Sequence, residues 1–126
     1  MKQYSIDIDK QNHIIRVKAW GRMNPDEGKG LIIEARKLAL TYESGILYDI
    51  QELELEGASL FDFYYLPREH EVFSKPESRK MKVAIVVSEI NSQKSKYDFY
   101  EDVTHNLGFQ VRVFMKKEDA ESWIKA

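Results

Sequence analysis

The sequence predicts an α/β fold in which an N-terminal β-hairpin is followed by alternating helices and strands. The expected sheet has about five strands, mostly parallel, and is covered by about four helices. Three observations lead to this fold class: alternating apolar and polar residues near the N-terminus, short β-branched runs later in the chain, and segments of helical apolar spacing between those runs. Such alternation is typical of parallel strands joined by right-handed crossovers.

The first two strands are expected to pair as a hairpin. Apolar residues alternate with polar ones in residues 4–8 (YSIDI), and the pattern recurs within residues 14–20 (IIRVKAW). Polar residues 10–12 separate the two runs. A period of two indicates strands with one buried face, and so short a connection favours antiparallel pairing.

The first helix has a strong start signal in the sequence NPDE. Asn24 suits the N-cap, Pro25 the first helical position and Glu27 the partner position of a capping box. Apolar residues then recur at helical spacing, and Ser44 with Gly45 ends the element. The apolar positions are Leu31, Ile32, Ala35, Leu38, Ala39 and Tyr42.

The rest of the chain continues the alternation of strands and helices. Three later strands are expected at residues 45–50 (GILYDI), 82–87 (KVAIVV) and 109–114 (FQVRVF). Three later helices are expected at residues 59–73, 95–107 and 117–126. Pro67 falls inside the first of these helices, so a kink or break is expected near Leu66.

Composition narrows the function classes. The 126 residues fit one domain spanning residues 1–126, and a net charge of −2 gives no general attraction to nucleic acid. With no cysteine, the chain has neither disulfides nor thiolate chemistry. The N-terminus lacks the apolar core of a signal peptide, and no run is apolar enough to span a membrane, so a cytoplasmic location is expected.

No motif indicates catalysis, a cofactor or a metal. The glycines near the first helix lack the spacing of phosphate-binding loops. His13, His70 and His105 fall in separate elements without metal-ligand spacing. Ser59 lacks the G-x-S-x-G context of an activated nucleophile. We therefore expect a protein that is not an enzyme and needs no cofactor, with an enzyme whose site is invisible in the sequence as the third alternative.

The most unusual segment is LFDFYYL, residues 60–66. Its aromatic residues are consecutive, so a helix through them would be apolar around much of its circumference. Packing in the core is the favoured explanation, and the alternative is that some rings line a pocket or face a partner. The ligand or partner candidates are Phe61, Phe63, Tyr64 and Tyr65.

Several residues together resemble the SpoIIAA-like branch of the STAS superfamily, which includes anti-sigma-factor antagonists. The resemblance covers nearly the whole chain, and none of its motifs is catalytic. It lies in the hairpin ending at Gly21, the NPDE helix start, the strand ILYDI ending near Asp49, the strand KVAIVV, and the run VRVF followed by Ala120, Trp123 and Ile124.

In antagonists of this superfamily, a partner kinase phosphorylates a serine at the start of the helix after the third strand. Ser59 lies ten positions beyond Asp49, as such a serine does, although GASL stands where the family has DSSG. A phosphate at a helix N-terminus changes the local charge by nearly two units, which suits a switch of partner binding. A simple N-cap role is the alternative for Ser59.

The resemblance also suggests a hydrophobic pocket between sheet and helices, with Trp20 and Tyr48 joining the aromatic segment in its lining. The leading hypothesis is thus a non-catalytic binding or regulatory module that binds a protein partner or a small apolar ligand through the second helix. A phospho-switched antagonist acting through Ser59 is the alternative. A second copy of the chain is a further candidate partner.

Overall fold

The computed structural model contains one five-stranded sheet with strand order β1-β2-β3-β4-β5. The structure describes residues 3–57, 67–68, 71–90 and 94–126. β1 pairs antiparallel with β2, and the remaining neighbours are parallel, so the predicted α/β fold class is confirmed. The strands are β1 (Tyr4–Asp9), β2 (Ile14–Met23), β3 (Gly45–Leu55), β4 (Lys82–Val86) and β5 (Gln110–Phe114).

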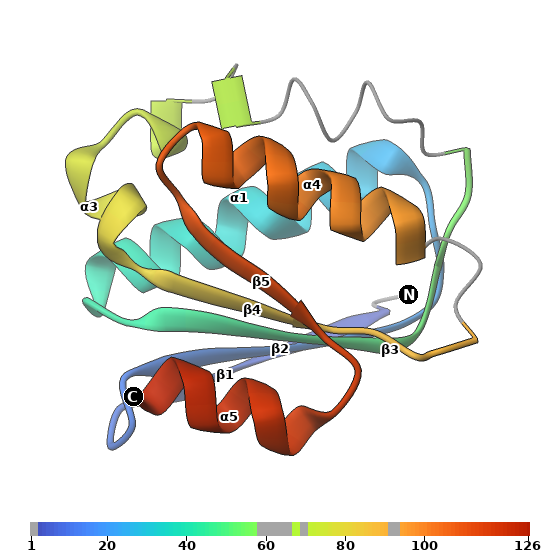
Figure 1. The fold of residues 1–126 in the computed structure, drawn as a ribbon, viewed down its shortest axis with the longest axis horizontal. Helices are drawn as coiled ribbons and strands as arrows, with labels where there is room; N and C mark the ends of the chain where they lie inside the picture. Colours follow the sequence, from blue (N-terminus) through green and yellow to red (C-terminus); the bar gives the residue numbers. More distant parts are fainter. Residues whose placement is uncertain (1–2, 58–66, 69–70, 91–93) are drawn as a thin grey trace.

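Helices cover the two faces of the sheet unequally (Figure 1). α1 (Pro25–Thr41) and α4 (Lys94–Asn106) lie over one face, and α5 (Lys117–Lys125) lies over the other. The short elements η1 (Glu71–Phe73) and α3 (Pro76–Lys80) contact one another and α1. Among the described residues, no helix combines the length and apolar character needed to cross a membrane.

α1 begins as the sequence predicts. The Asn24 side chain accepts a hydrogen bond from the backbone N–H of Glu27 at 2.8 Å, and the Glu27 carboxylate accepts one from the backbone N–H of Asn24 at 3.2 Å. This reciprocal capping box fixes the direction in which α1 leaves β2. Leu31, Ala35 and Ala39 are buried against the sheet, as their spacing predicts.

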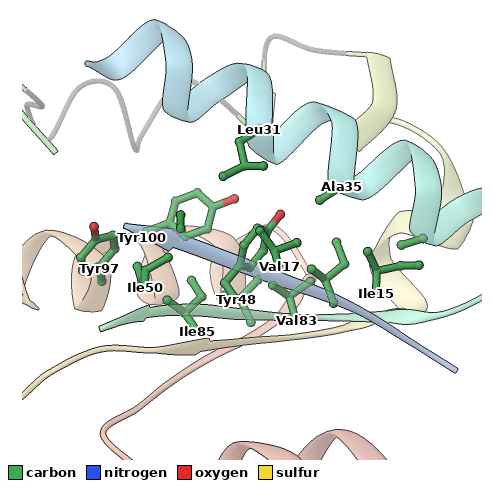
Figure 2. Close-up of a cluster of buried hydrophobic side chains, with 14 of the residues drawn as sticks. Ile15, Val17, Leu31, Ala35, Tyr48, Ile50, Val83, Ile85, Tyr97 and Tyr100 are labelled. Carbon is green, nitrogen blue, oxygen red and sulfur yellow. The ribbon is translucent and has the colours of Figure 1, made fainter. Parts of the chain in front are cut away.

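The main core lies between the sheet and the α1–α4 layer (Figure 2). Its strand residues follow the period of two, so that Ile15 and Val17 of β2 face the same side as Val83 and Ile85 of β4. A smaller cluster on the opposite face joins strand residues such as Leu47 to Ala120 of α5.

β3 is longer than predicted because it contains a β-bulge. The register shifts between Lys18 and Trp20 of β2, which leaves two consecutive residues of β3, Gln51 and Glu52, exposed. The shift returns the next apolar residues to the core side, including Leu53. The prediction that the strand ends at Ile50 is therefore wrong, and the acidic stretch that follows is its second half.

The helix predicted for residues 59–73 is only partly confirmed where the structure describes it, because residues 67–68 are helical but residues 71–73 are not α-helical. Residues 71–73 form a 3₁₀ turn, and a separate short helix follows at Pro76–Lys80, where none was predicted. Phe73 is fully buried beneath this turn and meets Phe109 edge to face, with ring centres 5.7 Å apart. The kink expected near Leu66 lies outside the described residues.

α5 is attached to its face of the sheet by charged groups as well as apolar ones. Arg16 of β2 forms a bidentate pair with Glu121 and a second ion pair with Asp9 at 3.1 Å. Lys82 donates to the backbone oxygens of Trp123 and Ala126 at 3.1 and 2.7 Å, at the C-terminal end of α5, where a cation is favoured by the helix dipole. The elements predicted for residues 95–107 and 117–126 are confirmed to within one residue at each end.

Candidate ligand cavity

A cavity lies in the main core between α1, α4 and the central strands. The volume of the cavity is about 70 Å³, several times the ~10–15 Å³ that one water molecule needs. The surface that lines it is almost entirely apolar. A space of this character favours a small apolar molecule over water.

Five elements of the described chain line the cavity, and each contributes the residues that its own periodicity turns inward. The strands contribute alternate positions, and the helices contribute residues spaced one turn apart. The lining consists of Met23 from β2, Gly28, Leu31, Ile32 and Arg36 from α1, Tyr48, Ile50, Leu53 and Leu55 from β3, Val83 and Ile85 from β4, and Tyr97 and Tyr100 from α4.

Three tyrosines contribute their rings to the wall of the cavity. Figure 2 shows Tyr48 rising from the sheet toward α1, with Tyr97 and Tyr100 reaching in from α4. Burial raises the pKa of all three phenols, and for Tyr48 and Tyr100 the nearby charge of Arg36 offsets part of that rise. The phenols therefore stay protonated at neutral pH and can donate hydrogen bonds.

Arg36 is the one cation in the described lining of the cavity. It is 2% exposed, and its Nη1 donates to the carbonyl oxygen of Ser78 at 3.1 Å. Its guanidinium lies 4.4 Å from the ring centre of Phe73 and 5.5 Å from that of Phe109, at distances of cation–π attraction. Its buried Nε has no hydrogen-bond partner among the described residues, and no carboxylate among them pairs with it.

The structure separates the two described residues that the sequence placed in one pocket. Tyr48 is buried and lines the cavity. Trp20 is 37% exposed on the opposite face of the sheet, because the buried Ala19 beside it faces the core. The expectation that Trp20 lines this cavity is therefore wrong. Its role toward a partner stays a prediction.

The other candidates named from the sequence are Ser59, Phe61, Phe63, Tyr64 and Tyr65, and they lie outside the described residues. Their roles also stay predictions. Within the described part of the chain, no group of three or more histidine or acidic side chains lies together as a metal site would require.

Sequence reasoning missed Arg36, although a signal was present. Arg36 follows Ile32 by four residues and precedes Ala39 by three, so it shares the inward stripe of α1. A cation on the apolar stripe of a helix needs a buried partner, which marks the position as unusual.

No protein-family model matches the chain, and no curated protein or solved structure matches it at the required level of similarity. The chemistry of the cavity is therefore the basis for assigning a function to this chain.

Proposed function

We propose that this protein is a non-catalytic binding module of the SpoIIAA-like type that takes a small apolar molecule into the cavity between α1, α4 and the sheet. The observation that supports the proposal is the apolar cavity of about 70 Å³ lined by Tyr48, Tyr97 and Tyr100. Its volume is about half the ~150 Å³ of an engineered cavity that binds benzene, so it suits a short alkyl chain, and a longer chain or a ring would have to displace lining side chains.

Burial of apolar surface supplies the driving force for such a ligand. Each buried CH₂ group contributes about 0.8 kcal/mol, so a six-carbon chain gains a few kcal/mol before the cost of losing its motion. A small ligand of this kind binds in the micromolar to millimolar range, which NMR titration measures well.

The test uses hexan-1-ol and two matched tryptophan variants. Leu53 lines the cavity, whereas Glu54 is exposed on the other side of the same strand. Leu53→Trp should fill the cavity and weaken hexanol binding at least tenfold, and Glu54→Trp should bind as the original chain does. The expected signature is a set of shifted NMR signals that includes those of Tyr48 and Tyr100.

Three outcomes distinguish binding in the cavity from binding elsewhere and from no binding. Saturable hexanol binding that Leu53→Trp alone removes supports the cavity as the site. Binding that both variants retain places the ligand elsewhere and contradicts the proposal. No binding of hexanol, or of benzene as a ring-shaped probe, to the original chain also contradicts it. Melting curves of both variants show whether each is folded before binding is compared.

We further propose that the protein acts in the cytoplasm and that its partners do not include nucleic acid. The net charge of −2 supports the second part, because a nucleic-acid-binding surface is normally basic. A protein partner or a second copy of the chain is the other partner class. Sedimentation of the purified protein over a hundredfold concentration range tests for the homodimer.

A further inference from the structure

We propose that two copies of this chain associate through the outer edge of β1, strand against strand in antiparallel orientation. The contact would join the two five-stranded sheets into one continuous sheet. Three observations carry the proposal: β1 turns backbone groups outward, the opposite edge of the sheet is covered, and the side chains of β1 complement their own copies in one antiparallel register. The surface is separate from the ligand cavity, and the contact does not depend on a bound ligand.

β1 lies at one end of the strand order, and in the described part of the chain it pairs with β2 alone. Trp20 donates its backbone N–H to the carbonyl oxygen of Gln3 at 3.0 Å, so these two residues form a hydrogen-bonded pair. Such pairs alternate along antiparallel strands, and the N–H and C=O groups of Ile6 and Ile8 therefore point away from β2. Neither backbone has a hydrogen-bond partner among the described residues. Outward groups of this kind are a template for another strand.

The other edge of the sheet is covered by a side chain. Glu101 of α4 accepts a hydrogen bond from the backbone N–H of Val113 in β5 at 2.5 Å, where a neighbouring strand would otherwise bond. The cationic side chain of Arg112 is also exposed on β5, and cations on an edge strand discourage pairing. β1 contains no proline, lysine or arginine, and its register with β2 is unbroken. β1 is therefore the open edge of this sheet.

The apolar side chains of β1 match in one antiparallel register. The paired part of the strand runs from Gln3 to Asp9, so a two-fold axis at Ile6 gives the longest overlap of two copies. On the helix-covered side, Ile6 then meets Ile6 of the second copy, and Tyr4 meets Ile8. These three side chains are half-buried and already pack on the main core. The pairing would continue that core across the axis.

On the other face, the same register keeps acidic side chains from opposing one another. Ser5 faces Asp7 of the second copy, and Gln3 faces Asp9. An axis at Asp7 would instead place two carboxylates directly opposite each other, as would a parallel pair in register, and like charges in that position are destabilising. The charges of β1 thus suit a second copy in the register centred on Ile6, and we assign a second copy as the occupant.

The experiment begins with the original chain. Sedimentation over a wide concentration range should show an equilibrium between monomer and dimer. Amide hydrogen exchange should slow about tenfold at Ile6 and Ile8 where about nine-tenths of the chain is dimeric, because these amides become donors to the second copy. The amide of Asp7 already faces β2 and serves as the internal control, so its exchange should change little.

Two substitutions at Ser5 test the register. Ser5 is exposed and lies opposite Lys18 in its own chain. Ser5→Asp would oppose a second carboxylate to Asp7 of the other copy on both sides of the axis, and should weaken dimerisation about tenfold. Ser5→Lys should strengthen it by a similar factor. Ser122→Asp, at an exposed position of α5, is the matched control and should leave dimerisation unchanged.

The stability of one chain should change in the opposite order, because an acid at position 5 attracts Lys18 and a cation repels it. Altered folding therefore cannot imitate the expected order of dimerisation. A chain that stays monomeric at every concentration overturns the proposal and leaves the β1 edge to an extended segment of another protein. A dimer whose Ile6 and Ile8 amides exchange as fast as in the monomer also overturns it. Equal dimerisation of the two Ser5 variants contradicts the register and with it the proposal.

Discussion

Two non-glycine residues in the described part of the chain adopt a backbone conformation that residues with side chains rarely take. Glu43 has φ of 50° and His13 has φ of 56°. Glu43 follows the C-cap residue Tyr42, at a helix end where the N–H of Ser44 bonds to the carbonyl of Ala39 at 2.9 Å. Glycine normally fills this left-handed position, because a Cβ atom there crowds the backbone.

Replacing Glu43 by glycine should therefore stabilise the protein. We expect Glu43→Gly to raise the free energy of unfolding by about 1 kcal/mol, because it relieves the left-handed strain at the end of α1. Lys37→Gly, in the exposed interior of the same helix, is the matched control and should lower it by about 1 kcal/mol. Urea unfolding of the three proteins measures both changes. Equal effects of the two substitutions would contradict the prediction.

Arg36 shows how one buried residue can hold several elements together. Its guanidinium stacks on Phe73 and Phe109 and bonds to the backbone of Ser78, so it joins α1 to η1 and α3.

At the scale of elements, β3 and β4 leave no room for a side chain where β3 begins. A Cβ atom added at Gly45 would lie 2.7 Å from the carbonyl oxygen of Lys82 and 3.1 Å from Cδ1 of Ile124. A backbone oxygen cannot move aside as a flexible side chain can. Glycine at this position therefore permits both the strand pairing and the packing of α5.

Gly45→Ala should consequently destabilise the protein by about 2 kcal/mol, in the range of overpacked core sites. Gly30 is the matched control, because an added Cβ there meets no atom within 4 Å and lies inside α1. Gly30→Ala should stabilise by up to about 1 kcal/mol through helix propensity. Opposite signs in urea unfolding are the expected result, and a neutral Gly45→Ala would show that the strands separate more easily than the structure indicates.

The attachment of α5 should depend on pH through Glu121. Its hydrogen bonds to Arg16, more than its contact with Lys125, lower the pKa of this carboxyl below its ordinary value of 4.5. Because the folded pKa is the lower one, the stabilisation is complete above pH 4.5 and is lost as the pH falls through the folded pKa.

Glu121→Gln should therefore be less stable than the original chain at pH 7 and should lose less stability between pH 7 and pH 3. Glu118→Gln, at an exposed position of the same helix, serves as the control and should follow the original chain. Urea unfolding at the two pH values gives the comparison. A pH dependence identical in all three proteins would show that Glu121 does not contribute to it.

The elements themselves were largely predictable, and their exceptions have physical reasons. The capping box at Asn24 and the periodic helices are local patterns, so the sequence displays them directly. The second half of β3 was missed because its core positions change from even numbers, as at Ile50, to odd ones, as at Leu53. The phase change needs a bulge, and the bulge exists only through pairing with β2.

At the scale of the whole molecule, the sheet divides the protein into two sides with different chemistry. The side under α1 and α4 holds the cavity, and the side under α5 carries Trp20, which is exposed between Lys18 and Arg22 of the same strand. The chain has two tryptophans, so the variant Trp123→Phe keeps Trp20 as the single tryptophan, and its fluorescence reports on the α5 side of the sheet.

A ligand in the cavity should leave Trp20 untouched while it stabilises the fold. In Trp123→Phe we expect acrylamide to quench Trp20 equally with and without hexanol, because the sheet lies between them. Hexanol at a hundred times its dissociation constant should raise the free energy of unfolding by about 2.7 kcal/mol. Trp20→Phe, with Trp123 as the reporter, is the control. Protection of Trp20 by the ligand would place the binding site on the α5 side.

Periodicity and capping signals alone determined the α/β class, the hairpin, the capped first helix and the inward faces of most elements, because these depend on neighbours within one or two turns. The tertiary structure decided which inward residues meet. It placed Tyr48 in the cavity and Trp20 on the far side, left Arg36 without a carboxylate among the described residues, and inserted the bulge in β3. Each of these results depends on contacts between residues far apart in the sequence, which local patterns do not encode.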